Sequence, residues 1–241
     1  DVLHDISFTA EPGKTTAFIG STGCGKSTLV NLIPRFYDVT DGKITIDGKD
    51  IRNVSQHELR EKLGYVPQKA VLFSGDIASN ILYGNPDGSE AEMTEAATIA
   101  QATEFIEQKK KKYKSTISQG GSNVSGGQKQ RLSIARAIAK HPDVYIFDDS
   151  FSALDYKTDA TLRAKLKEKT AESTVMIVAQ RISTILHADQ IIVLDDGQIV
   201  GKGTHKELLK NCEAYYQIAS SQLSEKELEE DLKEVESYAK R

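Results

Sequence analysis

Short apolar runs recur along the chain, separated by polar and glycine-containing segments, and read TTAFIG, KITIDG, LGYVPQ, VYIFDD, TVMIVAQ and QIIVLDDGQIV. Several are continuously apolar, which is typical of strands covered on both faces, and helical patterns follow some of them. Strands that alternate with helices predict an α/β fold with a mainly parallel sheet core. Turns at Asp47–Gly48 and Asp195–Gly197 join alternating runs and predict hairpins of an added antiparallel part.

Two later segments differ from this core. Between about Asp76 and His141, alanine, glutamate, glutamine and lysine recur at helical spacing and no strand is expected, so the pattern predicts a helical insertion. From Gln222, the tail carries an apolar stripe that either docks on the core or a partner or lies on a partly frayed surface helix. The stripe consists of Leu223, Leu228, Leu232 and Val235. The predicted domains are a core with an antiparallel β subdomain (residues 1–75 and 142–221), a helical subdomain (76–141) and a C-terminal helical tail (222–241).

Composition narrows the class of protein. With 241 residues, 39% of them apolar, the chain can bury a large core. Its net charge of −4 comes from 31 basic and 35 acidic residues spread along its length, so we expect no nucleic-acid partner. The basic run Lys109 to Lys112 is interpreted as a solvated loop or helix end. Cys24 and Cys212 lie far apart without metal-ligand spacing, which favours a reducing cytosolic setting. No window approaches the ~18 consecutive apolar residues that would span a bilayer.

One glycine-rich loop suits phosphate binding. The stretch GSTGCGKST follows a predicted strand and precedes a predicted helix, which is the context of a P-loop. Its glycines let backbone amides point inward, Lys26 supplies a charge for the β and γ phosphates, and the Ser27 hydroxyl can ligate Mg²⁺. The predicted nucleotide-binding residues are Gly20, Ser21, Thr22, Gly23, Cys24, Gly25, Lys26, Ser27 and Thr28, with Cys24 as a small filler.

Two adjacent aspartates end the apolar run VYIF. As in a Walker B strand, the first of them, Asp148, would hold Mg²⁺ through water and complete the site that Ser27 begins. The alternative interpretation of Asp148 is a helix N-cap.

A second anion site is predicted at Ser125, Gly126, Gly127 and Gln128, where a helix begins. The apolar positions of that helix, Leu132, Ala135, Ile138 and Ala139, keep helical spacing. Paired glycines and a serine at a helix N-terminus offer exposed amides, a hydroxyl and the positive end of the helix dipole. Because one domain rarely needs two such sites for one triphosphate, the second is interpreted as facing the nucleotide of another subunit.

With these motifs in this order, the chain resembles the nucleotide-binding domain of an ATP-binding cassette (ABC) transporter over nearly its whole length. The matching motifs are Walker A at Gly20–Ser27, the Q-loop residue Gln68, the signature at Val124–Gln128, Walker B ending at Asp148, and the D-loop at Ser152–Asp155. The stretch VLFSGDIASNILYG resembles the exporter class. The resemblance implies a P-loop NTPase (RecA-like) core, ATP and Mg²⁺ as cofactors, Ser27, Gln68 and Asp148 at the metal, and two such domains paired head to tail around ATP.

Three positions depart from the family's catalytic pattern. Asp149 stands where a glutamate normally polarises or deprotonates the attacking water, and Gln180 stands where a switch histidine normally lies near the γ-phosphate. Gln119 to Gly121 reads QGG where exporters often carry Glu-Arg-Gly. The predicted catalytic residues are Gln68, Asp149 and Gln180. Aspartate in place of glutamate at position 149 and glutamine in place of histidine at position 180 together predict a site that binds ATP and hydrolyses it slowly.

The intact signature leads to a hypothesis about partners. The hypothesis is that the chain belongs to a heterodimeric exporter, in which it pairs with a non-identical second nucleotide-binding domain. A transmembrane domain is expected to be fused upstream, which places the chain at the cytoplasmic face of the cell membrane. The substitution Ser125→Arg tests the role of the signature in that complex. The alternatives are a competent homodimer and a soluble cassette ATPase that is not a transporter. The chain opens on DVLHDISF without a methionine, so we expect it to be a piece of something longer, and the adenine-stacking aromatic residue of exporters is expected upstream.

Overall fold

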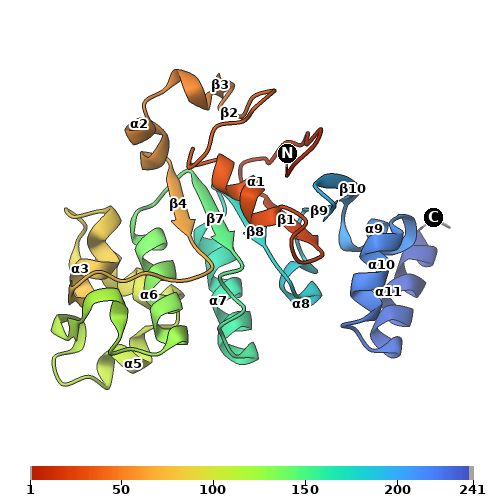
Figure 1. The fold of residues 1–241 in the computed structure, drawn as a ribbon. Helices are drawn as coiled ribbons and strands as arrows, with labels where there is room; N and C mark the ends of the chain where they lie inside the picture. The colour runs from red at the N-terminus through yellow and green to blue at the C-terminus, as the bar shows by residue number, and fades with distance from the viewer. Residues whose placement is uncertain (1, 239–241) are drawn as a thin grey trace. The chain divides into compact units, whose positions relative to one another are not determined.

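A computed structural model describes residues 2–238, with side chains as far as Asp231 (Figure 1). The chain divides into two compact units, Asp1–Leu59 with Thr174–Arg241, and Arg60–Ser173. Each unit is α/β, as the apolar runs predict. The helix α2, Gln56–Glu61, runs across the boundary. Among the described residues, no helix combines the length and apolarity needed to cross a membrane.

A sheet with the strand order β10-β9-β1-β8 organises the first unit. The strand β1 pairs parallel with β8 and β9, with Thr15 opposite Val175 and Thr16 opposite Gln190, whereas β10 is antiparallel to β9. The apolar runs of this unit are therefore buried strands, as Ala17 and Phe18 at 0% exposure illustrate. Its elements are β1 Thr15–Gly20, α1 Lys26–Leu32, β2 Thr45–Ile46, β3 Lys49–Asp50, η1 Ile51–Asn53, β8 Thr174–Val178, α8 Ile182–Ile185, β9 Gln190–Asp195, β10 Gln198–Gly203, α9 His205–Asn211, α10 Glu213–Ser220 and α11 Glu225–Tyr238.

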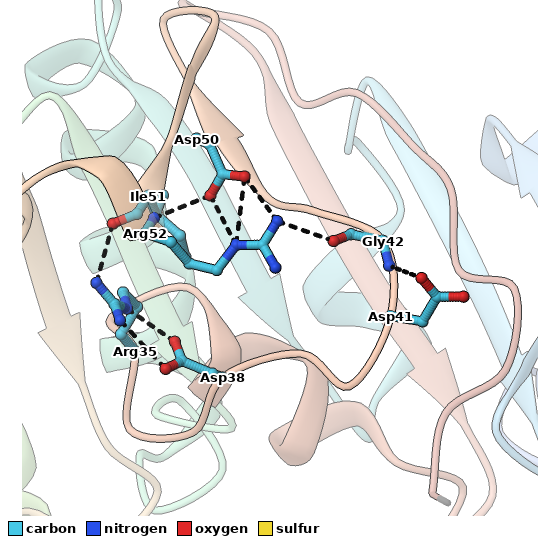
Figure 2. Close-up of polar contacts among 7 residues, drawn as sticks. All are labelled: Arg35, Asp38, Asp41, Gly42, Asp50, Ile51 and Arg52. Atoms are coloured by element: carbon cyan, nitrogen blue, oxygen red, sulfur yellow. Dashed lines mark hydrogen bonds and ion pairs between the residues drawn. The ribbon is translucent and has the colours of Figure 1, made fainter.

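Both predicted hairpins are present in the first unit. Asp47 and Gly48 join β2 to β3 with φ of 51° and 75°, and Asp196 and Gly197 join β9 to β10 with φ of 42° and 74°. Two consecutive positive φ angles are what a two-residue hairpin turn requires, and Asp-Gly tolerates them best. Two arginines support the first hairpin (Figure 2). Arg52 bonds the Asp50 carboxylate and the carbonyl of Gly42, and Arg35 bonds Asp38 and the carbonyl of Ile51.

The C-terminal tail forms a helix that contacts its own unit. The helices α9, α10 and α11 lie side by side (Figure 1). Ser224 precedes α11, and its hydroxyl accepts a hydrogen bond from the amide of Glu227 at 3.3 Å. Leu228 of the predicted stripe is buried at 7% exposure, while Leu232 and Val235 lie outside the residues whose side chains are described.

In the second unit, helices pack around two parallel strands. The strands β4 and β7 pair with Tyr65 opposite Ile146, and α6 packs against β4 and α4. All four predicted apolar positions of α6 are 0% exposed. The elements of this unit are β4 Leu63–Val66, β5 Gly75–Asp76, α3 Ile77–Ile81, η2 Leu82–Gly84, α4 Glu90–Ile99, α5 Thr103–Glu107, η3 Lys112–Lys114, β6 Thr116–Ile117, η4 Gln119–Gly121, α6 Gly126–Ala139, β7 Val144–Asp148 and α7 Tyr156–Lys169.

One expectation about the helical segment was wrong. No strand was expected between Asp76 and His141, yet β6 pairs antiparallel with β5, with Gly75 opposite Ile117 and Asp76 opposite Thr116. Each of these strands has two residues, which is too short for an alternating pattern to be visible in the sequence. The other elements of the segment are helical, as predicted.

Candidate functional site

The glycine-rich loop between β1 and α1 has the curled backbone that its sequence predicts. Gly20, Gly23 and Gly25 have φ of 156°, 86° and 100°, values that side chains disfavour. At Gly20 a Cβ atom would also meet the carbonyl oxygen of Leu194 at 2.0 Å, so only glycine fits beside β9. Gly25 is the N-cap residue of α1 and has no side chain that could cover the amides of the first turn. Those amides therefore suit an anion.

Lys26 lies at the centre of this loop. Its side chain is buried, and its ammonium donates to the carbonyls of Gly20 at 2.9 Å and Ser21 at 2.7 Å and to the Cys24 sulfur at 3.4 Å. Cys24 is 4% exposed, in keeping with a small filler, whereas Ser27 on the next position of α1 is exposed. The loop thus holds a positive charge at its centre, and the next residue has an exposed side chain with a hydroxyl.

In the second unit, the carboxyl ends of β4 and β7 bring polar groups together. Asp148 follows Ile146 by two residues and so shares a sheet face with Tyr65, the partner of Ile146. The Tyr65 hydroxyl lies 3.5 Å from an Asp148 carboxylate oxygen, and Asp148 is 4% exposed. Burial first, and the Asp148 charge second, hold the pKa of Tyr65 well above its usual range, so this phenol stays a hydrogen-bond donor.

Asp149 and Gln68 meet beside Asp148. The side-chain amide of Gln68 donates to an Asp149 carboxylate oxygen at 3.1 Å, and Ser152 donates to the Asp149 carbonyl at 2.9 Å. Asp149 is 7% exposed, and its φ of 46° is left-handed. Aspartate tolerates that conformation better than most residues with a Cβ. The structure therefore brings together the predicted catalytic residues of this unit.

The signature segment begins α6, as predicted, but its polar side chains already have local partners. Ser125 is the N-cap residue, and its hydroxyl accepts from the amide of Gln128 at 3.2 Å while the Gln128 side chain accepts from the amide of Ser125 at 3.1 Å. This reciprocal pair is a capping box, a role that our sequence reading missed although the pattern Ser-x-x-Gln signals it. Ser125 and Gly126 are exposed, so the N-terminus of α6 remains accessible.

Gln180 follows β8 in the first unit, and buried residues lie on both sides of the exposed pair Gln180 and Arg181. Its side chain is exposed, whereas Ala179 and Ile182 are 2% and 0% exposed. The backbone around Gln180 is held by Gln222, which accepts from the amide of Ile182 and donates to the carbonyl of Gln180, both at 2.9 Å. Sequence reasoning missed Gln222 because no local pattern connects residues about forty positions apart.

Each unit, taken by itself, contains an oxygen donor of a kind that Mg²⁺ prefers. Carboxylate and hydroxyl oxygens, as in Asp148 and Ser27, are the hard ligands that Mg²⁺ prefers. Within residues 2–231, no group of three or more His, Cys, Asp or Glu side chains forms a metal cage. Mg²⁺ usually binds through one or two carboxylates together with substrate phosphates, so a single acid such as Asp148 suits it.

Comparison with known sequences gives a consistent result. Residues 3–152 match the sequence profile of the family described as ABC transporter. An uncharacterized ABC transporter ATP-binding protein of Mycobacterium tuberculosis is 50% identical over 224 residues, which cover 92% of this chain and 38% of that protein. A Staphylococcus aureus protein, named provisionally a multidrug export ATP-binding/permease protein, is 45% identical over 221 residues, with the same shares covered. The chain thus spans less than half the length of these relatives.

A solved structure shares the fold. A bacterial Atm1-family ABC exporter with ATP bound superposes with a TM-score of 0.90 at 39% sequence identity. The match covers 93% of this chain and 40% of that one. At this identity the likeness extends over both α/β units and supports the P-loop NTPase fold that the loop after β1 predicts.

Proposed function

Because the chain belongs to the ABC transporter family, we propose that it is the ATP-binding domain of an exporter and couples ATP binding and hydrolysis to transport. The observation that carries this proposal is the curled loop of Gly20 to Thr28, with the Lys26 ammonium at its centre. Soluble cassette ATPases share that loop. The exporter assignment is supported by the name of the Staphylococcus aureus relative and by the similarity to the Atm1-family exporter.

Each part of the site has a role in this proposal. The loop amides and Lys26 bind the phosphates, while Ser27, Gln68 and Asp148 hold Mg²⁺. When bound, the metal neutralises charge on the phosphates. Gln68 orients the Asp149 carboxylate through the 3.1 Å contact, and Asp149 in turn orients or deprotonates the attacking water.

The wider assembly is part of the same proposal. Two nucleotide-binding domains pair head to tail, and Ser125 to Gln128 at the start of α6 complete the active site of a non-identical partner. A transmembrane domain, fused upstream, accompanies the chain at the cytoplasmic face of the membrane. In this proposal the functional subdomains are a core of residues 1–75 with 142–221, a helical subdomain of residues 76–141 and a tail of residues 222–241.

The chain's own site is proposed to be degenerate, with slow hydrolysis. Replacing glutamate by Asp149 withdraws the carboxylate by about 1.5 Å. A displacement of about 1 Å can cost on the order of 100-fold in rate. Gln180 can donate and accept hydrogen bonds but lacks the cationic form available to histidine.

One observation favours a competent site instead. Asp149 has a left-handed backbone, with φ of 46°. Aspartate is several-fold enriched in that conformation, so a local backbone preference can account for the residue without any loss of activity. In that case Asp149 is itself a sufficient base, and the domain works in an ordinary homodimer.

Mg-ATP turnover decides between these two functions. The chain should be measured at high protein concentration beside Asp149→Glu with Gln180→His, using Lys26→Ala to set the background. A degenerate site predicts a nearly silent parent and a double variant that is faster by about 100-fold. Melting temperatures recorded in parallel show whether glutamate at the left-handed position unfolds the domain.

The opposite outcome would be equally informative. A parent that turns over as fast as the double variant establishes Asp149 as a working base and removes the main support for a heterodimer. A parent that binds no ATP in the presence of Mg²⁺ overturns the assignment as an ATP-binding domain.

A further inference from the structure

We infer that Gln222 is a positioning residue for the segment that carries Gln180, and that it gives the site part of its preference for ATP over ADP. The inference rests on the proposed function, in which Gln180 faces the γ-phosphate. Its structural basis is the pair of hydrogen bonds, both 2.9 Å, that join the Gln222 side chain to the backbone on either side of Arg181.

The first of these bonds supplies a cap that α8 does not provide for itself. Arg181 is the N-cap residue of α8, and an arginine side chain has donors but no acceptor. The amide of Ile182, in the first turn, has no partner within the helix and needs an acceptor from elsewhere. The Gln222 oxygen accepts from it, so a residue forty positions later caps this helix.

The second bond fixes the peptide group of Gln180 itself. The Gln222 nitrogen donates to the Gln180 carbonyl and so favours the observed orientation of that peptide plane. The two partners also determine which end of the Gln222 amide is oxygen, because one partner is an obligatory donor and the other an obligatory acceptor. One side chain therefore holds both backbone groups that flank Arg181.

Gln222 can act as a brace because its own backbone is fixed. Its amide donates to the carbonyl of Ala219 at 3.0 Å, and the amide of Leu223 donates to the same carbonyl at 2.8 Å. Ala219 is 0% exposed at the end of α10. The backbone of Gln222 is thus attached to the buried C-terminal end of α10.

The other end of the Gln180 segment is fixed to the sheet. The amide of Ala179 donates to the carbonyl of Phe18 in β1 at 3.0 Å. With Ala179 bonded to β1 and Ile182 bonded to Gln222, the exposed Gln180 and Arg181 form a short bridge between two anchors. Releasing the Gln222 anchor removes one constraint on the backbone that directs the Gln180 side chain, so that side chain should shift. A group that meets only the γ-phosphate then loses contact with ATP and not with ADP.

The test compares Gln222→Ala with Gln217→Ala in the same chain. Gln217 lies on α10, and its amide donates to Glu213 of the same helix at 3.0 Å, so its removal leaves the Gln180 segment untouched. Dissociation constants for ATP and ADP with Mg²⁺ are measured by calorimetry, and exchange of the Ile182 amide by NMR. Gln222→Ala should weaken ATP binding relative to ADP by about fivefold, the factor of one net hydrogen bond, and speed Ile182 exchange, while Gln217→Ala does neither.

A second variant separates the two bonds and guards against loss of folding. Gln222→Glu keeps an acceptor for the Ile182 amide but removes the donor to Gln180, so Ile182 should stay protected while the preference for ATP falls. Equal weakening of ATP and ADP, or an unchanged ratio of the two dissociation constants while Ile182 exchange accelerates, overturns the inference alone. A wild-type chain that binds neither nucleotide overturns the proposed function and the inference with it.

Discussion

At the scale of single residues, the ion pair of Asp50 and Arg52 shows how one partner lowers the pKa of a carboxyl group. Arg52 bonds the Asp50 carboxylate through its guanidinium at 2.7 Å and through its own backbone amide at 2.9 Å (Figure 2). The side-chain hydrogen bond first, and the backbone bond second, lower the pKa of Asp50 to about 2. The charged form is thus favoured in the folded chain, so any stability it contributes is present above the ordinary pKa and lost as pH falls through about 2.

Replacing the arginine tests this cause. Arg52→Ala removes the guanidinium but keeps the backbone amide, so we expect the pKa of Asp50 to rise toward, without reaching, its ordinary value of 3.8. A carboxyl-carbon NMR titration measures it. Arg35→Ala is the matched control. Because Arg35 pairs with Asp38 and lowers its pKa, this variant should raise the pKa of Asp38 and leave the pKa of Asp50 low. An Asp50 pKa that does not move in Arg52→Ala would assign its low value to another group.

Residue identities in the phosphate loop were predictable because the loop's backbone demands them. Gly23 and Gly25 have positive φ angles, and a Cβ atom at Gly20 would lie 2.0 Å from the carbonyl oxygen of Leu194. Glycine meets these conditions best, so the glycine pattern predicts the backbone geometry. The contact between Gln68 and Asp149 has no corresponding pattern in the sequence. It joins two strand ends whose residues are 81 positions apart, and no local rule specifies it.

At the scale of elements, a buried histidine joins the three C-terminal helices. His205 of α9 is 5% exposed, and its Nδ1 lies 2.7 Å from the Tyr215 hydroxyl of α10, while its Nε2 lies 3.1 Å from the Asp231 carboxylate of α11. Buried polar groups with this many partners stabilise a structure when all are satisfied and are costly when one is removed. The docking of α11 therefore depends on side chains from all three helices.

Removal of one hydroxyl tests that dependence. Tyr215→Phe leaves the Nδ1 of His205 without its bond to α10, and should lower the free energy of unfolding by about 1–3 kcal/mol. Urea unfolding measures the change, and hydrogen exchange should show faster opening of α11. Tyr216→Phe removes a hydroxyl from the next residue, which is 37% exposed, and should change stability by less than about 0.5 kcal/mol. Equal effects of the two variants would contradict the proposed link.

Elements were predictable from the sequence in proportion to their length and periodicity. Five elements have enough apolar positions to be identified as strand or helix from the sequence. They are the five-residue and six-residue strands β1, β7, β8 and β9 and the 14-residue helix α6. The two-residue pair β5 and β6 does not, and it was missed. The cap on α8 could not be anticipated either, because its acceptor, Gln222, lies forty positions later, in the turn between α10 and α11.

At the scale of the whole molecule, the proposed assembly predicts a division of labour between two subunits. In the complex with a partner, Ser125→Arg should reduce Mg-ATP turnover by about 100-fold, the typical effect of removing a donor from a phosphate-binding terminus. The substitution also removes the N-cap of α6, which by itself costs about 1 kcal/mol of stability.

A second cap in the same unit provides the control for that loss. Ser89 caps α4 through the same reciprocal bonds with Glu92, so Ser89→Arg removes an equivalent cap at another helix. Turnover of the complex should survive Ser89→Arg and fall in Ser125→Arg. Unchanged turnover in Ser125→Arg would remove the signature segment from the partner's active site.

The pairing of β1 also has a consequence for biosynthesis. Thr15 pairs with Val175, 160 positions later (175 − 15), and Thr16 pairs with Gln190 later still. At about 5–20 residues per second, a ribosome needs roughly 10–30 s to supply β8 after β1 has been made. Throughout that interval β1, with its apolar Ala17, Phe18 and Ile19, has two open edges of the kind that promote misassembly. Of the four strands in the sheet of this unit, the one that leads into the phosphate loop is made first, yet its pairing is complete only after β8 and β9 have been made.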